Sequence, residues 1–269
     1  MSAEGLAGLL RSFHLSTMAG TWEESAGRAE QENWGYRRFL QHLCESEAQD
    51  RRERKMQRLL KDSGLPAGKT LGNLEENLLP LKIRRLLPTL LEGNFVTRAE
   101  NVLAFGLPGR GKSHCLAALA RELILRHGYT VLFTPTFKLV QQLLAAKQAL
   151  KLDAFLKKLD RYAVVVLDDI GYVQQSREEM EVLFTFLAER YERRSVMITS
   201  NLVFSKWDQI FKDPMTTMAA IDRLVHHSLM GVMQINPKRV SATSAEGNND
   251  TNSYEKEITA VVSVKFEVK

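Results

Sequence analysis

Short apolar runs alternate with helical stretches through the middle of the chain. The runs are rich in valine and isoleucine, do not alternate strictly with polar residues, and cover 101–106, 130–134, 163–169 and 195–201. Apolar positions at helical spacing lie between them, at about 112–127, 137–159 and 177–193. Parallel strands that are covered on both faces are apolar throughout, and strand–helix alternation builds such sheets. The pattern therefore predicts an α/β domain over about 76–228, with helices on both faces of a parallel sheet.

The first 75 residues show a different pattern, with no alternating run typical of a strand. Apolar residues at helical spacing form two stripes, the first at Tyr36, Phe39, Leu40 and Leu43 and the second at Met56, Leu59 and Leu60. Spacings of three and four residues place side chains on one face of a helix. Ser63-Gly64 and Pro66 then interrupt the pattern. We expect a small all-helical N-terminal domain over 1–75, connected to the α/β domain through residues 65–73.

The last zone, residues 229–269, resembles neither of the others. Residues 241–253 are polar and low in complexity, which is typical of a flexible linker. The final residues then place apolar side chains at every second position, at Ile258, Ala260, Val262, Val264, Phe266 and Val268. Period two predicts a β-strand. We interpret 229–269 as an atypical C-terminal tail, and we favour an edge strand or a loosely ordered tail without its own function.

Composition limits the class of protein. The chain has 269 residues, 44% hydrophobic and 26% charged, as in a soluble globular protein. Apolar runs such as 163–167 are far shorter than the roughly 20 residues of a membrane span. The first residues lack the basic leader and long apolar run of a secretory signal, and two cysteines are too few for a disulfide framework. We expect a cytoplasmic protein with no membrane partner. Its net charge of +5 permits a polyanionic partner without requiring one.

A glycine-rich motif directly follows the first predicted strand and opens a predicted helix. GLPGRGKS, at 106–113, matches the P-loop pattern G-x-x-x-x-G-K-[ST]. Glycines let the backbone curl so that successive N–H groups point at a phosphate, and the helix adds its positive end. A glycine-rich turn that binds nothing is the alternative, which the strand–loop–helix setting disfavours. We expect the nucleotide to be bound by Gly106, Pro108, Gly109, Arg110, Gly111, Lys112, Ser113 and His114. Lys112 would reach the β- and γ-phosphates, and the Ser113 hydroxyl would bind Mg²⁺.

Two carboxylates end the third predicted strand, in AVVVLDDIG. Asp168 is placed to hold Mg²⁺ through water, and Asp169 to orient the water that attacks the γ-phosphate. An aspartate pair at a strand end is a weak signal alone, because acidic residues often end strands. Downstream of a P-loop, the same pair is a strong one. Together the two motifs predict binding of a nucleoside triphosphate with Mg²⁺ and hydrolysis of its γ-phosphate.

Two further polar residues complete the predicted catalytic set. Asn201 follows the fourth strand, so it would lie beside the other strand ends and sense the γ-phosphate. The alternative for Asn201 is a turn-forming residue. Arg223, in AAIDRLVHH, is a candidate to contact the transferring phosphate in a neighbouring subunit. Such an arginine accelerates phosphoryl transfer by about 10³–10⁵-fold. The alternative for Arg223 is an ordinary solvated or ion-paired side chain.

Basic residues cluster within an N-terminal zone that is neutral overall, with eleven Lys or Arg and eleven Asp or Glu in residues 1–75. The cluster consists of Arg51, Arg52, Arg54, Lys55, Arg58 and Lys61. On a helix most of these would lie along one side, which suits the phosphates of duplex DNA. A solvated helix face is the alternative. A second, weaker candidate is Lys82, Arg84 and Arg85. No base-reading motif is present, so any contact should be mainly with the DNA backbone.

Four blocks together resemble one family. They are GLPGRGKSH at 106–114, VVVLDDIGY at 164–172, LAERYERRSVMITSN at 187–201 with FSKWDQIF after it, and AAIDRLVHHS at 219–228. Over about residues 10–228 the chain resembles the IstB-like helper ATPases of bacterial insertion sequences, AAA+ proteins related to the DnaC helicase loaders and the DnaA initiator.

The resemblance implies an AAA+ fold in which Gly111, Lys112 and Ser113 form Walker A and Asp168 and Asp169 form Walker B. By the same resemblance, Asn201 is sensor 1 and Arg223 is the arginine finger. It also implies homo-oligomers that assemble on duplex DNA, remodel it, and stimulate and guide a cognate transposase. The segment from Leu229 onward differs from the usual ending of the family.

The leading interpretation is an ATP-dependent helper of DNA transposition. A DnaC-like loader of a replicative helicase, preferring single strands, is the runner-up that the core motifs leave open. A small-molecule kinase is disfavoured because no substrate-binding lid is evident. A nucleotide-dependent scaffold without turnover is disfavoured by the Asp168–Asp169 pair.

Overall fold

The computed structural model describes residues 3–75, 79–170, 176–202, 207, 219–221, 223–224 and 228–234. The chain divides into two units, Met1–Arg58 and Leu59–Lys269. The division falls inside helix α3 (Tyr36–Asp62). Residues 59–75, which the sequence pattern assigned to the N-terminal domain, therefore lie in the second unit. No helix in the described part of the chain is both long and apolar enough to span a bilayer.

The first unit is helical throughout its described residues, as predicted. It contains α1 (Ala3–Ser12), α2 (Ser16–Gln31) and most of α3. The apolar stripe near the start of α3 is only partly buried: Leu43 is 7% exposed, whereas Tyr36 is 96% and Leu40 60% exposed. Helical spacing therefore predicted the helix correctly but overstated how much of its apolar face is covered.

A buried carboxylate fastens the start of α2 to α3. Glu47, on α3, is 3% exposed. One of its oxygens accepts hydrogen bonds from the main-chain N–H groups of Thr17 (2.8 Å) and Met18 (3.0 Å). Its other oxygen accepts from Arg51 Nε at 2.8 Å. Because the first N–H groups of a helix have no partner within the helix, Glu47 supplies the acceptor that α2 lacks.

We expect Glu47→Gln to destabilise the packing of α2 on α3 by about 1.5–3 kcal/mol, the range for hydrogen bonds to charged groups. Burial alone would raise the pKa of Glu47, but hydrogen bonds from Met18, Arg51 and Thr17 outweigh it, so the pKa is lowered. A carboxylate with a lowered pKa stabilises the fold above its unfolded-state pKa of about 4.3, and this contribution is lost as pH falls through the folded pKa.

The difference between wild type and Glu47→Gln should therefore be largest at neutral pH and shrink below about pH 4.3. Amide hydrogen exchange of α2 in the intact chain measures it. The control is Glu45→Gln, which removes an exposed carboxylate from the same helix. A gap that stays constant down to pH 3 would show that the charge of Glu47 is not what holds α2.

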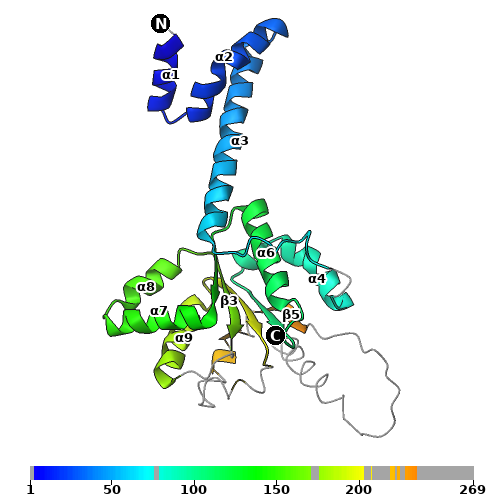
Figure 1. The fold of residues 1–269 in the computed structure, drawn as a ribbon, viewed down its shortest axis with the longest axis vertical. Helices are drawn as coiled ribbons and strands as arrows, with labels where there is room; N and C mark the ends of the chain where they lie inside the picture. The colour runs from blue at the N-terminus through cyan, green and yellow to red at the C-terminus, as the bar shows by residue number, and fades with distance from the viewer. Residues whose placement is uncertain are drawn as a thin grey trace, which may run out of the picture. The chain divides into compact units, whose positions relative to one another are not determined.

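The second unit is built on a β-sheet (Figure 1). Its described strands are all parallel, in the order β2-β3-β4-β1-β5. The strands are β1 (Asn101–Phe105), β2 (Val131–Pro135), β3 (Val164–Ile170), β4 (Ser195–Ser200) and β5 (Ser228–Gln234). The helices are α4 (Leu81–Leu91), α5 (Asn94–Thr97), α6 (Lys112–His127), α7 (Thr136–Gln148), α8 (Leu152–Leu159) and α9 (Arg177–Arg190). The first four strands and α6 agree with the predicted ranges to within one or two residues.

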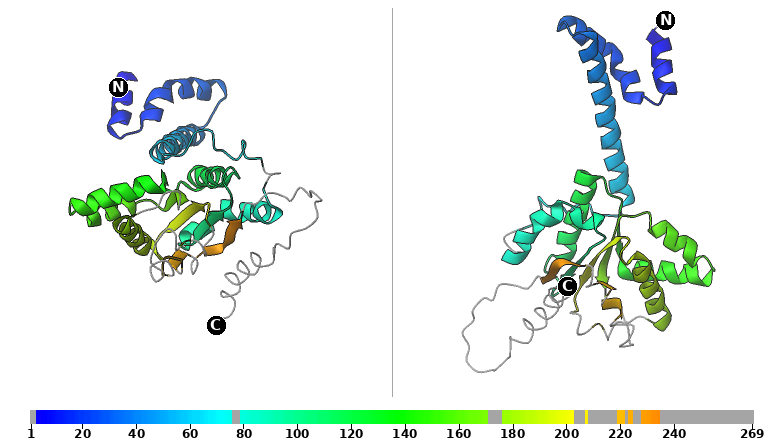
Figure 2. Two further views of the ribbon diagram at one scale, coloured as in Figure 1. Left: turned by 60° about the horizontal axis from the view of Figure 1, so that its bottom comes forward. Right: turned by 180° about the vertical axis from the view of Figure 1, so that it is seen from behind.

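Helices cover both faces of the sheet (Figure 2). The crossover from β1 to β2 runs toward the β2 edge of the sheet. The crossovers from β2 to β3 and from β3 to β4 run in the opposite direction, away from that edge. Since such crossovers are right-handed, α6 and the pair α7 and α9 lie on opposite faces. Strands β1 and β4 are buried along their whole length, which explains the apolar runs 102–105 and 196–198 within them. The predicted α/β class is confirmed.

Two details differ from the predicted elements. The helix expected over 137–159 is broken into α7 and α8 by a Schellman turn, in which Leu150 N–H donates to Lys147 O (3.0 Å) and Lys151 N–H to Ala146 O (2.8 Å). Leu150 takes the left-handed position (φ 55°) that glycine usually occupies, so the sequence carries no break signal there.

The second difference concerns the tail. Strand β5 pairs with β1 in parallel, so residues 228–234 extend the sheet and are not part of a separate tail. The polar segment 241–253 and the strand predicted after it lie outside the described residues.

The segment that follows α3, residues 63–75, is attached to the sheet and helices of the second unit at several points, and we call it the linker segment. Phe133 N–H, on the edge strand β2, donates to Ser63 O at 2.7 Å. Arg121 on α6 donates to Pro66 O at 3.1 Å. Gly64 between them has φ +69°, and a Cβ there would lie 3.0 Å from Phe133 O, so the close approach requires glycine. These contacts explain why the unit begins before residue 75.

Candidate nucleotide site

The loop between β1 and α6 has the backbone that a phosphate cradle requires. Gly109 (φ +76°) and Gly111 (φ +78°) adopt left-handed conformations, and a Cβ at either position would meet no atom within 4 Å. Gly111 is the N-cap of α6 and no described side chain caps that helix, so its first N–H groups remain available. The open space and the uncapped helix end lie together, as anion binding needs. Pro108 and Arg110 belong to the same loop, where Arg110 is exposed.

Lys112 brings a buried ammonium group to this cradle. The residue is 6% exposed, and its Nζ donates to Leu107 O at 3.0 Å and to Asn201 Oδ1 at 2.8 Å. Burial lowers the pKa of Lys112, while the nearby carboxylates of Asp169 and Asp168 oppose the shift. Lys112 thus reaches from the start of α6 to the end of β4.

Asn201 connects that lysine to a carboxylate. Its Nδ2 donates to Asp169 Oδ1 at 2.9 Å, while its Oδ1 accepts from Lys112. We refer to these three side chains as the Lys112–Asn201–Asp169 network. Burial, and then the charge of Asp168, raise the pKa of Asp169, although Lys112 acts to lower it. The structure therefore brings together residues that lie far apart in the sequence and that the sequence analysis had assigned to one site.

The two carboxylates sit on a bulge of β3. Leu167 pairs with Ile198 and Ile170 with Ser200, so Asp168 and Asp169 together stand opposite the single residue Thr199. Asp169 has φ +61°, a left-handed conformation that is uncommon outside glycine. Thr199 was assigned no role in the site from the sequence alone. No motif marks it, because its importance depends on strand pairing.

A nucleoside triphosphate with Mg²⁺ fits this set of groups. The loop offers main-chain N–H donors and a lysine to the phosphates, and Ser113 and Asp168 offer the oxygen ligands that Mg²⁺ prefers. Thr199 Oγ1 donates a hydrogen bond to Asp168 Oδ1 at 2.7 Å. The second oxygen of Asp168 has no hydrogen-bond partner among the described residues. That oxygen and the hydroxyl of Ser113 are the groups of this chain that would hold the cation.

One predicted nucleotide contact points elsewhere. The imidazole of His114 donates through Nε2 to Thr70 O in the linker segment, at 3.0 Å. The side chain is therefore directed at the linker segment, and a contribution to phosphate binding is left to the main-chain N–H of His114. Its position after Ser113 could not reveal this, because Thr70 lies outside the motif.

Arg223 lies over an aromatic ring of α9. Its guanidinium carbon is 4.5 Å from the ring centroid of Phe184, and its buried NH1 nitrogen has no hydrogen-bond partner among the described residues. No arginine side chain hydrogen-bonds to the Lys112–Asn201–Asp169 network within the described ranges. Over those ranges, the network is without an arginine of its own chain.

The clustered cations of α3 divide into two groups. Arg51 and Arg54 are engaged within the first unit: Arg51 binds Glu47 and His14 O, and Arg54 binds Asp50 and the hydroxyls of Ser16 and Thr17. The other group consists of Arg52, Lys55, Arg58 and Lys61, which are exposed and have no ion-pair partner in the part of the chain that the structure describes. The second candidate set, Lys82, Arg84 and Arg85, lies on α4.

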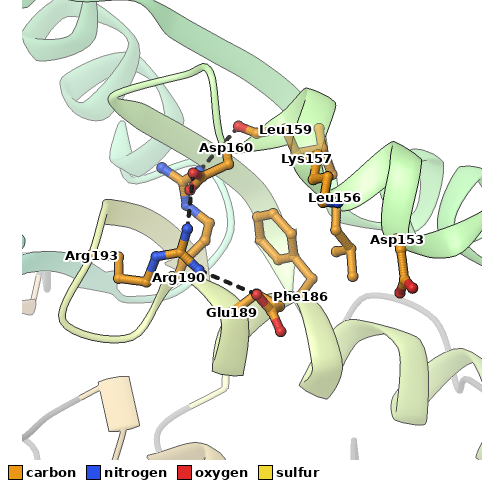
Figure 3. Close-up of a pocket in the computed structure, with 9 residues that line it drawn as sticks. All are labelled: Asp153, Leu156, Lys157, Leu159, Asp160, Phe186, Glu189, Arg190 and Arg193. Carbon is orange, nitrogen blue, oxygen red and sulfur yellow. Dashed lines mark hydrogen bonds and ion pairs between the residues drawn. The ribbon is translucent and has the colours of Figure 1, made fainter.

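A cavity of about 350 Å³ lies between α8 and α9 (Figure 3). It adjoins the starts of β3 and β4, whereas the carboxylates lie near the other end of β3. Arg190 borders it, is 2% exposed, and donates to the main-chain oxygens of Leu159, Tyr162, Ala163 and Ser195. Burial lowers the pKa of Arg190 to about 9. Arg193, at the rim, is paired with Asp160 and Glu189. Arg190 therefore ties the starts of β3 and β4 together and does not contribute to the nucleotide site.

Comparison with known sequences identifies close relatives. A family model described as "IstB-like ATP binding protein" matches residues 8–245. The chain is 39% identical over 240 residues to a putative insertion sequence ATP-binding protein of Sinorhizobium fredii, covering 88% of this chain and 80% of the relative. It is 37% identical over 225 residues to the insertion sequence IS21 putative ATP-binding protein of Pseudomonas aeruginosa, covering 84% and 83%.

Comparison with solved structures agrees in fold. Domain III of the replication initiation protein DnaA from Thermotoga maritima superposes with a TM-score of 0.52 at 15% identity, over 75% of this chain and 76% of that one. The DnaC helicase loader superposes with a TM-score of 0.50 at 17% identity, over 58% and 89%. At such identities the likeness concerns the fold alone.

Proposed function

The chain belongs to the IstB-like ATP-binding proteins of insertion sequences, and on that premise we propose that it is a Mg²⁺-dependent ATPase that helps DNA transposition. It would assemble as a homo-oligomer on duplex DNA, remodel that DNA, and stimulate and direct a cognate transposase. The observation that carries the ATPase part is the Lys112–Asn201–Asp169 network beside an open, uncapped P-loop.

In hydrolysis, each residue of the site has a separate task. Asp169 orients a water molecule and accepts its proton while the water oxygen bonds to the γ-phosphorus and the bond to the β–γ bridging oxygen breaks. Lys112 places its positive charge against the β- and γ-phosphates. To do so, it gives up its hydrogen bonds to Leu107 O and Asn201. Asn201 then bridges the γ-phosphate and Asp169, so the position of Asp169, the catalytic base, depends on whether that phosphate is bound. A bound Mg²⁺ supplies further positive charge to the phosphates.

Assembly would complete the site with an arginine. Phosphoryl transfer gains about 10³–10⁵-fold from an arginine at the transferring phosphate. Arg223 is the candidate, and because it stacks on Phe184 of its own chain, we propose that it acts on the site of a neighbouring subunit. A complete site would then exist only in an oligomer.

The ATPase rate, measured against protein concentration with duplex or single-stranded DNA, tests the proposal. A rate that duplex stimulates, rising more steeply than linearly with protein, is expected. Stimulation by single strands alone would favour the alternative function, a DnaC-like helicase loader. A rate indifferent to every DNA would contradict the DNA part and leave the ATPase part standing.

Duplex binding is expected to depend on the exposed cations of α3 that form no ion pair among the described residues. Replacing Arg52, Lys55 and Arg58 together with glutamine should weaken binding at low salt, because phosphate contacts release bound counterions. The slope of log affinity against log salt should become shallower by about one for each phosphate that is no longer neutralised, with little dependence on DNA sequence. Fluorescence anisotropy over a range of salt concentrations measures both.

The matched control removes the same charge from the second unit. Lys138, Lys151 and Lys158 are exposed residues of the α7–α8 region, and replacing them with glutamine should leave the salt slope nearly unchanged. Equal slopes for wild type and the α3 variant would exclude this face of α3 as the phosphate-binding surface. Arg51 and Arg54 are left out of the variant because their loss would disturb the packing of α2.

A further inference from the structure

We propose that Thr199, on β4, is the positioning residue for both carboxylates of the ATPase site. The proposal rests on the proposed ATPase function and adds a residue to it. Thr199 fixes which oxygen of Asp168 is left for the metal ion, and it holds the bulge that brings Asp169 to the same edge of the sheet.

The hydroxyl of Thr199 is used in both directions. Its Oγ1 donates to Asp168 Oδ1 at 2.7 Å and accepts from the main-chain N–H of Asp169 at 2.7 Å. A threonine hydroxyl has one hydrogen, so donating it to Asp168 leaves the lone pairs for the Asp169 N–H. The residue is 1% exposed, so water does not compete for either bond. Asp168 Oδ1 is thereby occupied, and its other oxygen is presented for a cation.

The bulge explains why one hydroxyl matters to two carboxylates. In a regular strand, successive side chains point to opposite faces, so Asp168 and Asp169 would be separated by the sheet. Here the two stand opposite one residue of β4, and Asp169 takes φ +61°. Non-glycine residues persist in that conformation only where the surroundings enforce it. The bond from Asp169 N–H to Thr199 replaces the ladder bond that the bulge removes.

A second hydroxyl supports the same turn from the other side. Thr136, at the start of α7 and 1% exposed, donates to the main-chain oxygen of Asp168 at 3.0 Å. It holds the backbone but does not touch a carboxylate oxygen. Of these two threonines, Thr199 is therefore the one that contacts the carboxylate of Asp168 and can orient its metal-binding oxygen.

Thr199→Val tests the proposal, because valine keeps the shape of threonine and removes the hydroxyl. The quantity to measure is the factor by which Mg²⁺ increases the affinity for a fluorescent ATP analogue. We expect this factor to fall by about 10–100-fold in the variant, the usual loss when a partner of a metal ligand is removed. Hydrolysis should fall by a similar factor. Affinity without Mg²⁺ should stay near wild type, because the P-loop is untouched, and this also verifies that the variant is folded.

Two further variants separate positioning from packing. Thr199→Ser restores the hydroxyl and should recover both the Mg²⁺ effect and the rate to within a few-fold. Thr134→Val makes the same change at a threonine of β2 that is 7% exposed and whose hydroxyl bonds only to Pro135 O among the described residues, so it should behave as wild type. Should Thr199→Val lose Mg²⁺-free binding, Thr199→Ala is compared with Thr199→Ser in the same assays.

The outcomes distinguish this inference from the proposed function. A Thr199→Val chain with an unchanged Mg²⁺ effect overturns the role of Thr199, as does a serine variant that recovers nothing. A wild-type chain that binds nucleotide with a Mg²⁺ effect but hydrolyses none under any condition overturns the ATPase proposal instead. In that case the binding comparison still decides on Thr199.

Discussion

Replacement of Asp169 by asparagine is expected to slow ATP hydrolysis by about 10²–10⁴-fold while nucleotide affinity stays within a few-fold of wild type. Asparagine keeps an oxygen for the bond from Asn201 Nδ2 but cannot accept a proton from the attacking water. The P-loop and Lys112 are untouched, so the phosphates should still bind. The measurements are the steady-state rate and the equilibrium binding of a fluorescent ATP analogue.

The control for this change is Asp153→Asn, which removes an exposed carboxylate from α8. It should hydrolyse ATP at the wild-type rate. Hydrolysis at that rate by Asp169→Asn would rule out Asp169 as the group that activates water. A loss of binding together with the rate would indicate that Asp169 holds the nucleotide and has no separate catalytic role.

Arg223→Ala is expected to have the largest effect on the rate, a loss of about 10³–10⁵-fold in the assembled state. Its own P-loop should bind ATP normally, because Arg223 contacts Phe184 and does not contact the network. The sharpest measurement mixes Arg223→Ala with Asp169→Asn, each inactive alone. Some neighbouring pairs then combine Asp169 of one chain with Arg223 of the other, and activity should reappear.

The mixture has its own control. Arg223→Ala mixed with the Asp169→Asn, Arg223→Ala double variant contains no intact Arg223, so it should remain inactive. Phe184→Leu, which removes the aromatic ring beneath the guanidinium, checks that a packing defect is not the cause. Full activity of Arg223→Ala alone would exclude the arginine, and a mixture that never recovers would exclude its action between subunits.

Local patterns predicted most of the fold because the physics behind them is local. The strands of the sheet have apolar centres because both faces are covered, and that shows directly in segments such as 163–167. The P-loop is a contiguous motif whose glycines and lysine serve the same group. Lys112 was assigned to the site by the P-loop motif, and Asn201 and Asp169 by the rule that parallel strands end at one edge. The hydrogen bonds show that the three side chains lie together.

What the sequence could not reveal depends on partners far along the chain or on an uncommon backbone conformation. Thr199 belongs to no recognisable motif, and its role arises from its place on β4, opposite the bulge of β3. Leu150 ends α7 in a conformation that leucine rarely adopts. Arg51 and Arg54 belong by charge to a basic stripe, but Arg51 also binds His14 O and Arg54 the hydroxyls of Ser16 and Thr17, which lie on distant parts of the chain. In each case the deciding interaction is one that charge, spacing or propensity does not encode.

The bond between Ser63 and β2 also bears on how the chain can be shortened. β2 is an outer strand of the sheet, and Ser63 O takes the N–H of Phe133 that would otherwise face water. A fragment beginning at Leu81 would keep every residue of the ATPase site but would expose this edge. Unsatisfied strand edges recruit strands from other molecules and lead to aggregation. Protection against aggregation thus resides in a stretch of chain that contains no catalytic residue, and a soluble ATPase fragment should start no later than Leu59.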